Sequence, residues 1–211
     1  MPYQSLCRVA ALLLAVTALS ACASMSRDEC ATVDWRTVGY EDGAAGQGAE
    51  RLTSRRKACA KHGVTPDLDA YRFGREEGLE EYCQPANGFR VGASGAGYGG
   101  ACPDHLSLAF SDAYQAGRKL WALESQLDDT NRGIAYRRAE ITRIDETMAA
   151  NGFVLMGETT TPQERAKALL DVKTLAERRG RLKAEMESLE RERPHQQAEL
   201  DNYRAQLAYN Y

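Results

Sequence analysis

The 211-residue chain has few aromatic residues, no basic excess and few histidines, and each shortage excludes a class of protein. Aromatic residues make up 8% of the chain, which is too few for a large all-β core. The 27 Lys and Arg residues against 30 Asp and Glu leave a net charge of −3, so the chain has no broad basic field for nucleic acid. An apolar share of 43% still allows a folded core, which excludes disorder throughout.

Motifs of catalysis and of metal or cofactor binding are missing as well. The three histidines, His62, His105 and His195, form neither an i,i+4 pair nor an H-E-x-x-H motif, and no Gly-x-Ser-x-Gly elbow occurs. Residues 95–100 fit G-x-G-x-x-G, but the strand before it and the helix after it that define a nucleotide site are not expected. The sequence therefore predicts no catalytic residue, metal or cofactor, and we expect a protein that is not an enzyme.

The N-terminal segment has the features of an export signal. Arg8 precedes an apolar run, Val9–Leu19, that is shorter than the roughly 20 residues needed to span a bilayer. The run ends in Leu19-Ser20-Ala21-Cys22, which resembles the lipobox of bacterial lipoproteins. We expect residues 1–21 to be removed as a signal peptide and Cys22 to carry fatty acids such as palmitate. The alternative is an ordinary secretory signal that is cleaved after Ala21.

The expected location is the periplasmic face of the outer membrane. By resemblance to lipoprotein sorting in two-membrane bacteria, Ala23 directly after the modified cysteine implies delivery there. Several acyl chains would anchor the protein stably, because each buried CH₂ group contributes about 0.8 kcal/mol. Residues 22–33 would then form a tether.

Four cysteines remain once Cys7 is removed with the signal peptide and Cys22 is assigned to lipid: Cys30, Cys59, Cys83 and Cys102. An even number in an exported protein favours two disulfides. Three pairings are possible, and we expect the sequential one, Cys30–Cys59 with Cys83–Cys102. A four-cysteine zinc site is the rival interpretation, but no C-x₂-C pair occurs.

Composition divides the mature chain into two parts. All six cysteines and 13 of the 18 glycines precede residue 104, whereas the remainder is rich in Ala, Leu, Glu, Arg and Gln. We therefore predict a mainly α protein with a small disulfide-linked helical head over residues 34–118, including a glycine-rich loop. A long antiparallel helical hairpin of coiled-coil type should follow over residues 119–211.

The hairpin prediction rests on heptad spacing. One helix has the series Leu120, Leu127, Ile134, Ile141, Met148 and the series Leu123, Thr130, Arg137, Ile144, and the other has Leu175, Leu182, Leu189, Tyr203 and Val172, Met186, Leu200, Leu207. The first helix should begin near Asp104 and end at Asn151-Gly152. Thr161-Pro162-Gln163-Glu164 should begin the second with a capping box, and Pro194 should kink or break it. Each helix would be about 45 residues and about 68 Å long.

A two-helix hairpin buries little surface, so we expect residues 119–211 to bind a protein partner or to self-associate. A hairpin that is only a solvated spacer is the alternative. The sequence gives no reason to expect nucleic acid as a partner.

The head contains an internal repeat. Residues 69–75 (DAYRFGR) match residues 112–118 (DAYQAGR) at five of seven positions, and a weaker copy begins at Tyr40. Gly39/Gly43 and Gly74/Gly78 stand four apart, and glycine inside a helix costs about 1 kcal/mol relative to alanine. Close packing against a backbone or a ring would offset this cost. We therefore expect three short helices to cross tightly around Trp35, Tyr40, Tyr71 and Tyr114.

Two candidate sites follow, each with a plainer interpretation. Tyr71, Arg75, Tyr114 and Arg118 could line a pocket for a glycan or an anionic envelope ligand, or they could serve only in packing. Five basic residues near the anchor, Arg51, Arg55, Arg56, Lys57 and Lys61, could meet anionic lipid, or they could form a solvated helix face.

A set of spaced residues in the head resembles a known family. These are Asp34-Trp35, Gly39, Asp42-Gly43, Cys59, residues 63–67 (GVTPD), Tyr71, Gly74-Arg75, Gly78-Leu79, Tyr82-Cys83, Asn87-Gly88 and Cys102-Pro103. Together with the lipobox, they resemble the bacterial lipoprotein family catalogued as domain of unknown function 2799, over roughly residues 28–125. This resemblance implies no activity, cofactor or catalytic residue.

Overall fold

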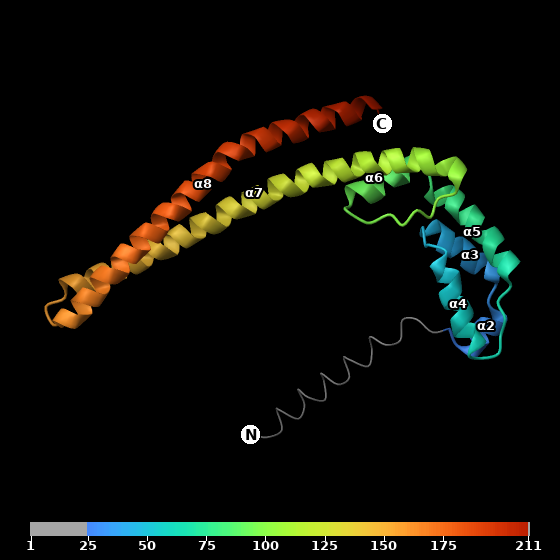
Figure 1. Cartoon of the computed structure of the whole chain (residues 1–211), viewed down its shortest axis with the longest axis horizontal. Helices are drawn as coiled ribbons and strands as arrows, with labels where there is room; N and C mark the ends of the chain where they lie inside the picture. Colours follow the sequence, from blue (N-terminus) through green and yellow to red (C-terminus); the bar gives the residue numbers. More distant parts are fainter. Residues whose placement is uncertain (1–24, 211) are drawn as a thin grey trace, which may run out of the picture. The chain divides into compact units, whose positions relative to one another are not determined.

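The computed structural model describes residues 25–210, with side chains through residue 208. Every regular element in this range is an α-helix, which confirms the predicted mainly α fold class (Figure 1). The helices are α2 (Arg27–Thr32), α3 (Trp35–Ala44), α4 (Glu50–Ala60), α5 (Leu68–Tyr82), α6 (Pro85–Ala93), α7 (Asp104–Met156) and α8 (Pro162–Asn210). The predicted signal peptide, 1–21, and the predicted lipid site, Cys22, lie outside the described residues.

The chain divides into two compact units. We call the described residues of 1–92 together with 96–115 the head unit, and 93–95 together with 116–210 the hairpin unit. The change from one to the other at 115/116 lies inside α7, where the sequence placed it at 118/119. No loop marks this boundary, because α7 is continuous across it.

The predicted tether, 22–33, is not wholly an extended linker. Residues 27–32 form α2, which begins with a capping box between Ser26 and Glu29. The Ser26 hydroxyl accepts from the Glu29 N–H at 3.2 Å, and the Glu29 carboxylate accepts from the Ser26 N–H at 2.7 Å. Cys30 on this helix is buried in the head, so α2 belongs to the folded unit.

The head unit has two small apolar clusters, each built around a disulfide. Trp35, Val38 and Tyr71 surround Cys30 and Cys59, whereas Leu79 and Phe110 surround Cys83 and Cys102. The prediction that Trp35, Tyr40, Tyr71 and Tyr114 lie together in one crossing of three helices is therefore wrong, because the aromatic residues are divided between two clusters. Tyr40 is 37% exposed, and Tyr114 packs against the second cluster rather than the first.

α7 and α8 form the predicted antiparallel hairpin, but both helices are longer than expected (Figure 1). α7 has 53 residues and continues through Asn151-Gly152 to Met156, and α8 has 49 residues. Pro194 lies inside α8 without breaking it, and the ribbon bends along its length. The connection is reduced to residues 157–161, so the predicted helix end at Asn151-Gly152 is wrong.

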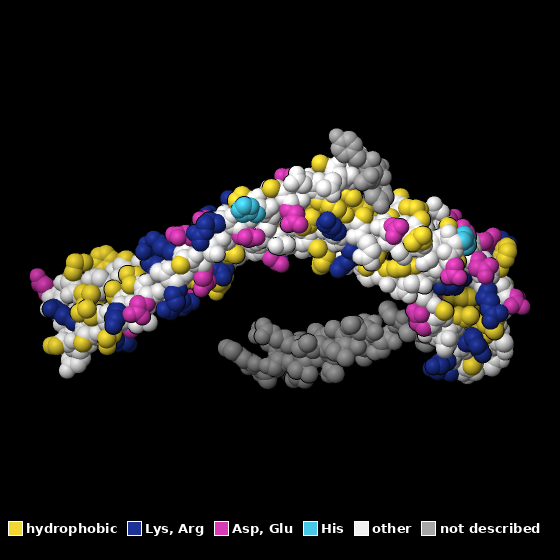
Figure 2. All heavy atoms as spheres, turned by 45° about the horizontal axis from the view of Figure 1, so that its top comes forward, with side chains coloured by type: hydrophobic (Ala, Val, Ile, Leu, Met, Phe, Trp, Pro, Cys, Tyr) yellow, Lys and Arg dark blue, Asp and Glu magenta, His cyan; other side chains and the backbone are white. Residues whose placement is uncertain are grey.

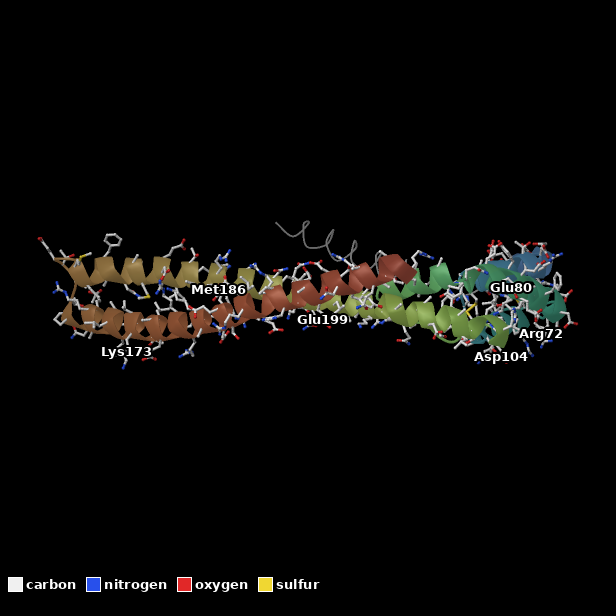
Figure 3. All side chains as sticks on the ribbon, turned by 90° about the horizontal axis from the view of Figure 1, so that it is seen from above. Arg72, Glu80, Asp104, Lys173, Met186 and Glu199 are labelled. Atoms are coloured by element: carbon white, nitrogen blue, oxygen red, sulfur yellow. A yellow bond between two sulfur atoms is a disulfide. The ribbon has the colours of Figure 1, made fainter. Side chains whose placement is uncertain are left out.

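The seam between α7 and α8 follows the predicted heptads. The buried residues on it are Leu123, Thr130, Ile134, Ile141 and Ile144 of α7 and Ala168, Gln196 and Leu200 of α8. Met186, another predicted seam position, lies between the two helices in Figure 3. Within the described residues, five ion pairs also join the helices: Arg137–Glu185, Arg138–Glu190, Glu140–Arg178, Asp145–Arg179 and Glu124–Arg204. Exposed pairs contribute little energy, but all five fit one antiparallel register.

The predicted start of α8 is confirmed atom by atom. The Thr161 hydroxyl accepts from the Glu164 N–H at 3.3 Å, and the Glu164 carboxylate accepts from the Thr161 N–H at 2.8 Å. These bonds also lower the pKa of Glu164 below its ordinary value. The capping box therefore fixes where the hairpin connection ends.

Candidate functional site

The centre of the head unit is a close crossing of α3 and α5. A Cβ atom at Gly39 or Gly43 would overlap the backbone of α5, and one at Gly74 or Gly78 would overlap the backbone of α3. Gly39 faces the Tyr71 carbonyl and Gly43 faces the Arg75 carbonyl, so both partners advance by four residues and the helices run parallel. This confirms that the glycine pairs serve close backbone packing.

A buried ion pair links this crossing to α4. Asp42 of α3 is 4% exposed and accepts hydrogen bonds from Arg55 Nε at 2.7 Å, Arg55 Nη2 at 2.6 Å and the Tyr71 hydroxyl at 2.7 Å. Burial raises the pKa of Asp42, but the bonds from Arg55 and Tyr71 outweigh it and hold the pKa below its ordinary value. Burial and the Asp42 carboxylate raise the pKa of Tyr71. The three donors around Asp42 all bond to its carboxylate, which is typical of a buried polar network that stabilises a fold.

The four predicted ligand residues each bond to a different partner. Tyr71 is fully buried on Asp42, and Arg75 Nη2 donates to the Gln47 carbonyl at 2.8 Å. The Tyr114 hydroxyl donates to the Ala96 carbonyl at 3.1 Å, and Arg118 Nη1 donates to the Gly95 carbonyl at 2.8 Å. Among the described residues, none of the four hydrogen-bonds to another. Tyr71 and Arg75 hold segments of the head unit together, and Tyr114 and Arg118 hold the glycine-rich loop, so each of the four has a contact within its own unit.

Both predicted disulfides are present, Cys30–Cys59 with Cα atoms 5.6 Å apart and Cys83–Cys102 with Cα atoms 5.7 Å apart. The second disulfide closes the glycine-rich loop, and aromatic side chains pack next to it. Tyr98 of that loop packs on Phe110 at a centroid distance of 4.7 Å, and its hydroxyl accepts from the Cys102 N–H at 3.1 Å. The loop is therefore held by covalent and aromatic contacts. In the described residues it follows helix α6 and not a strand, whereas a nucleotide site requires a strand before the glycines.

The five basic residues of the head separate into two groups. Arg55 binds Asp42, and Arg51 Nε lies 3.7 Å from the same carboxylate. The remaining three, Arg56, Lys57 and Lys61, are exposed. Figure 2 shows Lys and Arg side chains on the part of the head that contains α2 and the end of α4.

Five exposed apolar side chains of the hairpin unit lie where α7 ends and in the first turns of α8. We call Phe153, Val154, Met156, Leu169 and Leu170 the hairpin end, and they are 72%, 38%, 74%, 62% and 66% exposed. Figure 2 shows hydrophobic side chains grouped at this end of the hairpin. The sequence analysis did not predict a role for these residues. None of them belongs to a heptad series, and this spacing could have indicated that they face away from the seam.

Among residues 25–210, no group of three or more His, Cys, Asp or Glu side chains is placed to hold a metal ion. In the same part of the chain, no helix combines the length and the apolar character needed to cross a bilayer.

The comparisons agree with the spacing of the head residues. Residues 34–119 match the family described as protein of unknown function (DUF2799). The resemblance seen in the sequence is thus confirmed for this part of the chain, which includes the α3–α5 crossing, Asp42 and both members of the second disulfide. No curated protein and no solved structure shows significant similarity to the chain.

Proposed function

We propose that this protein is a non-enzymatic lipoprotein of the bacterial cell envelope, anchored through acylated Cys22, whose helical hairpin binds another protein. The lipobox-like sequence supports the anchor. The two disulfides support an oxidising compartment, since such bonds are rare where thiols are kept reduced.

The exposed hairpin end is the observation that carries the binding role. Contiguous apolar surface on a folded protein is typical of an interaction site. Acidic and basic side chains, including Glu158, Lys167 and Asp171, lie next to it in the sequence and are exposed. A rim of mixed charge suits a protein surface, because insertion into a bilayer would require the carboxylates to lose water.

Site-specific photo-crosslinking in cells tests the partner. A photoreactive phenylalanine analogue at Phe153 should give a crosslinked product of defined mass, whereas the same analogue at Tyr136 should not. Tyr136 is a matched control, because it is also aromatic, lies on the same helix and is 61% exposed. A product of twice the chain mass would identify a second copy as the partner.

A loss-of-contact variant completes this test. Phe153→Ser, Leu169→Ser and Leu170→Ser together should remove the partner from a crosslink placed at Met156, with helix content and membrane fractionation unchanged. Equal crosslinking from positions 153 and 136, or none from either, would contradict a role for the hairpin end.

Peptide mass spectrometry tests the anchor separately. In protein isolated from membranes, the first residue should be Cys22 carrying acyl chains. An intact leader, or a free Cys22 after cleavage behind Ala21, would exclude the lipoprotein proposal without bearing on the hairpin.

A further inference from the structure

Helix α4 has an inner face that holds the head together and an outer face with spare charge. Cys59 and Arg55 occupy the inner face, through the disulfide to Cys30 and the ion pair to Asp42. Arg56, Lys57 and Lys61 are exposed and form no ion pair with any carboxylate in residues 25–208. We call these three residues the α4 basic face. Glu50, the one acid in α4, lies in its first turn, at the opposite end from Lys61.

A shallow groove runs beside this basic face. It encloses about 340 Å³ and is lined by Thr53, Arg56, Lys57, Ala60 and residues 64–66. The lining thus combines two cations and two threonines with the apolar residues Ala60, Val64 and Pro66. Such a groove has donors for an anionic oxygen and apolar contact for the carbon atoms attached to it.

The fold places this face close to the predicted anchor. The Cys30–Cys59 disulfide ties α2 to the last turn of α4, and Arg55 Nη1 lies 3.8 Å from Met25 Sδ. Met25 is the third residue after Cys22, which corresponds to at most about 11 Å of chain. An acylated Cys22 would therefore hold Met25, and with it the part of α4 that Met25 contacts, near the membrane. Over distances comparable to the Debye length of about 8 Å, charges on α4 and on the lipid still interact in physiological salt.

We propose that the α4 basic face binds anionic lipid head groups of the membrane in which the protein is anchored. The inference rests on the anchor of the proposed function, because the short distance from Met25 to Cys22 is what brings α4 to the lipid. Arg51 and Arg55 are excluded from this role, since both face Asp42. The acyl chains would then fix the protein to the bilayer, while α4 would set the orientation of the head.

Vesicle binding tests the proposal without the anchor. The chain from Cys22 onward, carrying Cys22→Ser so that it has no acyl group, is mixed with vesicles of zwitterionic lipid alone or with 30% anionic lipid. Binding to the anionic vesicles should fall about 100-fold when Arg56, Lys57 and Lys61 are replaced by Gln, because each basic residue near an anionic surface contributes about a factor of five.

A charge-matched variant is the control. Lys173→Gln, Lys183→Gln and Arg191→Gln remove the same three charges from exposed positions on α8, and Figure 3 labels Lys173 on the outer side of the hairpin. This variant should bind like the parent chain. Equal losses from both variants, or equal binding of the parent to both kinds of vesicle, would overturn the proposal.

Two further arms separate the possible failures. Inorganic phosphate at constant ionic strength should not displace the chain from anionic vesicles, and displacement would assign the groove to a soluble phosphate compound instead. Mass spectrometry measures the acylation of Cys22, so an unmodified Cys22 would refute the anchor. Vesicle binding that is unchanged by the α4 substitutions would refute this inference alone.

Discussion

At the scale of single residues, Asp42 illustrates how a small domain holds a charge in its interior. Its carboxylate is buried, yet it receives three hydrogen bonds, from two nitrogens of Arg55 and from Tyr71. One carboxylate on α3 thus bonds to Arg55 of α4 and to Tyr71 of α5. Because both charges are largely removed from water, losing one partner is expected to cost more than the pair itself contributes.

We predict that Asp42→Asn destabilises the protein by about 3 kcal/mol, because Arg55 would keep its charge without a counter-ion. Urea unfolding followed by circular dichroism measures the change. The control is Asp69→Asn, whose side chain is 95% exposed and 3.4 Å from the exposed Arg72, so its unfolding should be nearly unchanged. Equal effects from both variants would show that Asp42 is not a structural centre.

The same pair predicts an acid dependence. The folded-state pKa of Asp42 lies below its unfolded value near 3.9, so its contribution is complete above about pH 4 and is lost as the pH falls through the folded-state pKa. The stability difference between the parent chain and Asp42→Asn should therefore shrink below pH 4. A difference that stays constant down to pH 2 would contradict this.

Some of these residue roles were visible in the sequence and others were not. The cysteine pairs and the Thr161 cap could be predicted, because cysteine count and capping chemistry are local or nearly local signals. Asp42 is among the residues that carry the family resemblance, but its role as the buried acceptor could not be predicted, since its partners lie 13 and 29 residues away and only the packing of α3, α4 and α5 brings them together. Tyr71 was noticed through the repeat, but its burial on Asp42 gives it a packing role.

At the scale of elements, the α3–α5 crossing depends on the absence of side chains. A Cβ atom at Gly74 would overlap the Arg36 carbonyl oxygen, which is backbone and cannot move aside without separating the helices. The flanking contacts depend on the same closeness: Arg36 donates to Glu77 at 2.8 Å and the Tyr40 hydroxyl donates to Glu81 at 2.9 Å. The glycines therefore allow α3 and α5 to approach closely enough for these side chains to bond to each other.

We predict that Gly74→Ala destabilises the protein by about 2–3 kcal/mol through overpacking. Gly180→Ala is the matched control, because it is also a helical glycine but has no atom within 4 Å of the added methyl group. This control should stabilise α8 by up to about 1 kcal/mol. Thermal unfolding of both variants measures the contrast, and a shift in the same direction for both would refute the role of the crossing.

Element boundaries show the limit of local signals. Asn87-Gly88 and Asn151-Gly152 both have the composition of a turn, yet both lie inside helices. Gly88 is explained by packing, because a Cβ atom there would approach the Phe110 carbonyl, whereas nothing lies near Gly152. Pro194 likewise lies within α8, since the seam on either side continues through Met186 and Leu200. Packing across the seam thus outweighs the local preference.

At the scale of the whole molecule, covalent links are confined to one of the two units. Both disulfides join residues of the head unit, and the hairpin unit contains no cysteine. The change in composition near residue 104 predicted this difference, although the boundary lies within α7 and not at its start. The hairpin is stabilised by its own seam, so the stabilities of the two units should respond to different agents.

Reduction of the disulfides should therefore separate the two units in an unfolding experiment. Each disulfide closes a loop of about 20–30 residues and contributes about 3 kcal/mol by restricting the unfolded chain. With a reductant, calorimetry should show the transition of the head unit at lower temperature and the transition of the hairpin unit unchanged. Proteolysis at intermediate temperature should then leave a fragment that contains α8. A single transition that shifts as a whole would mean that α7 couples the two units into one cooperative fold, because a helix that crosses their boundary cannot unfold in one unit without fraying into the other.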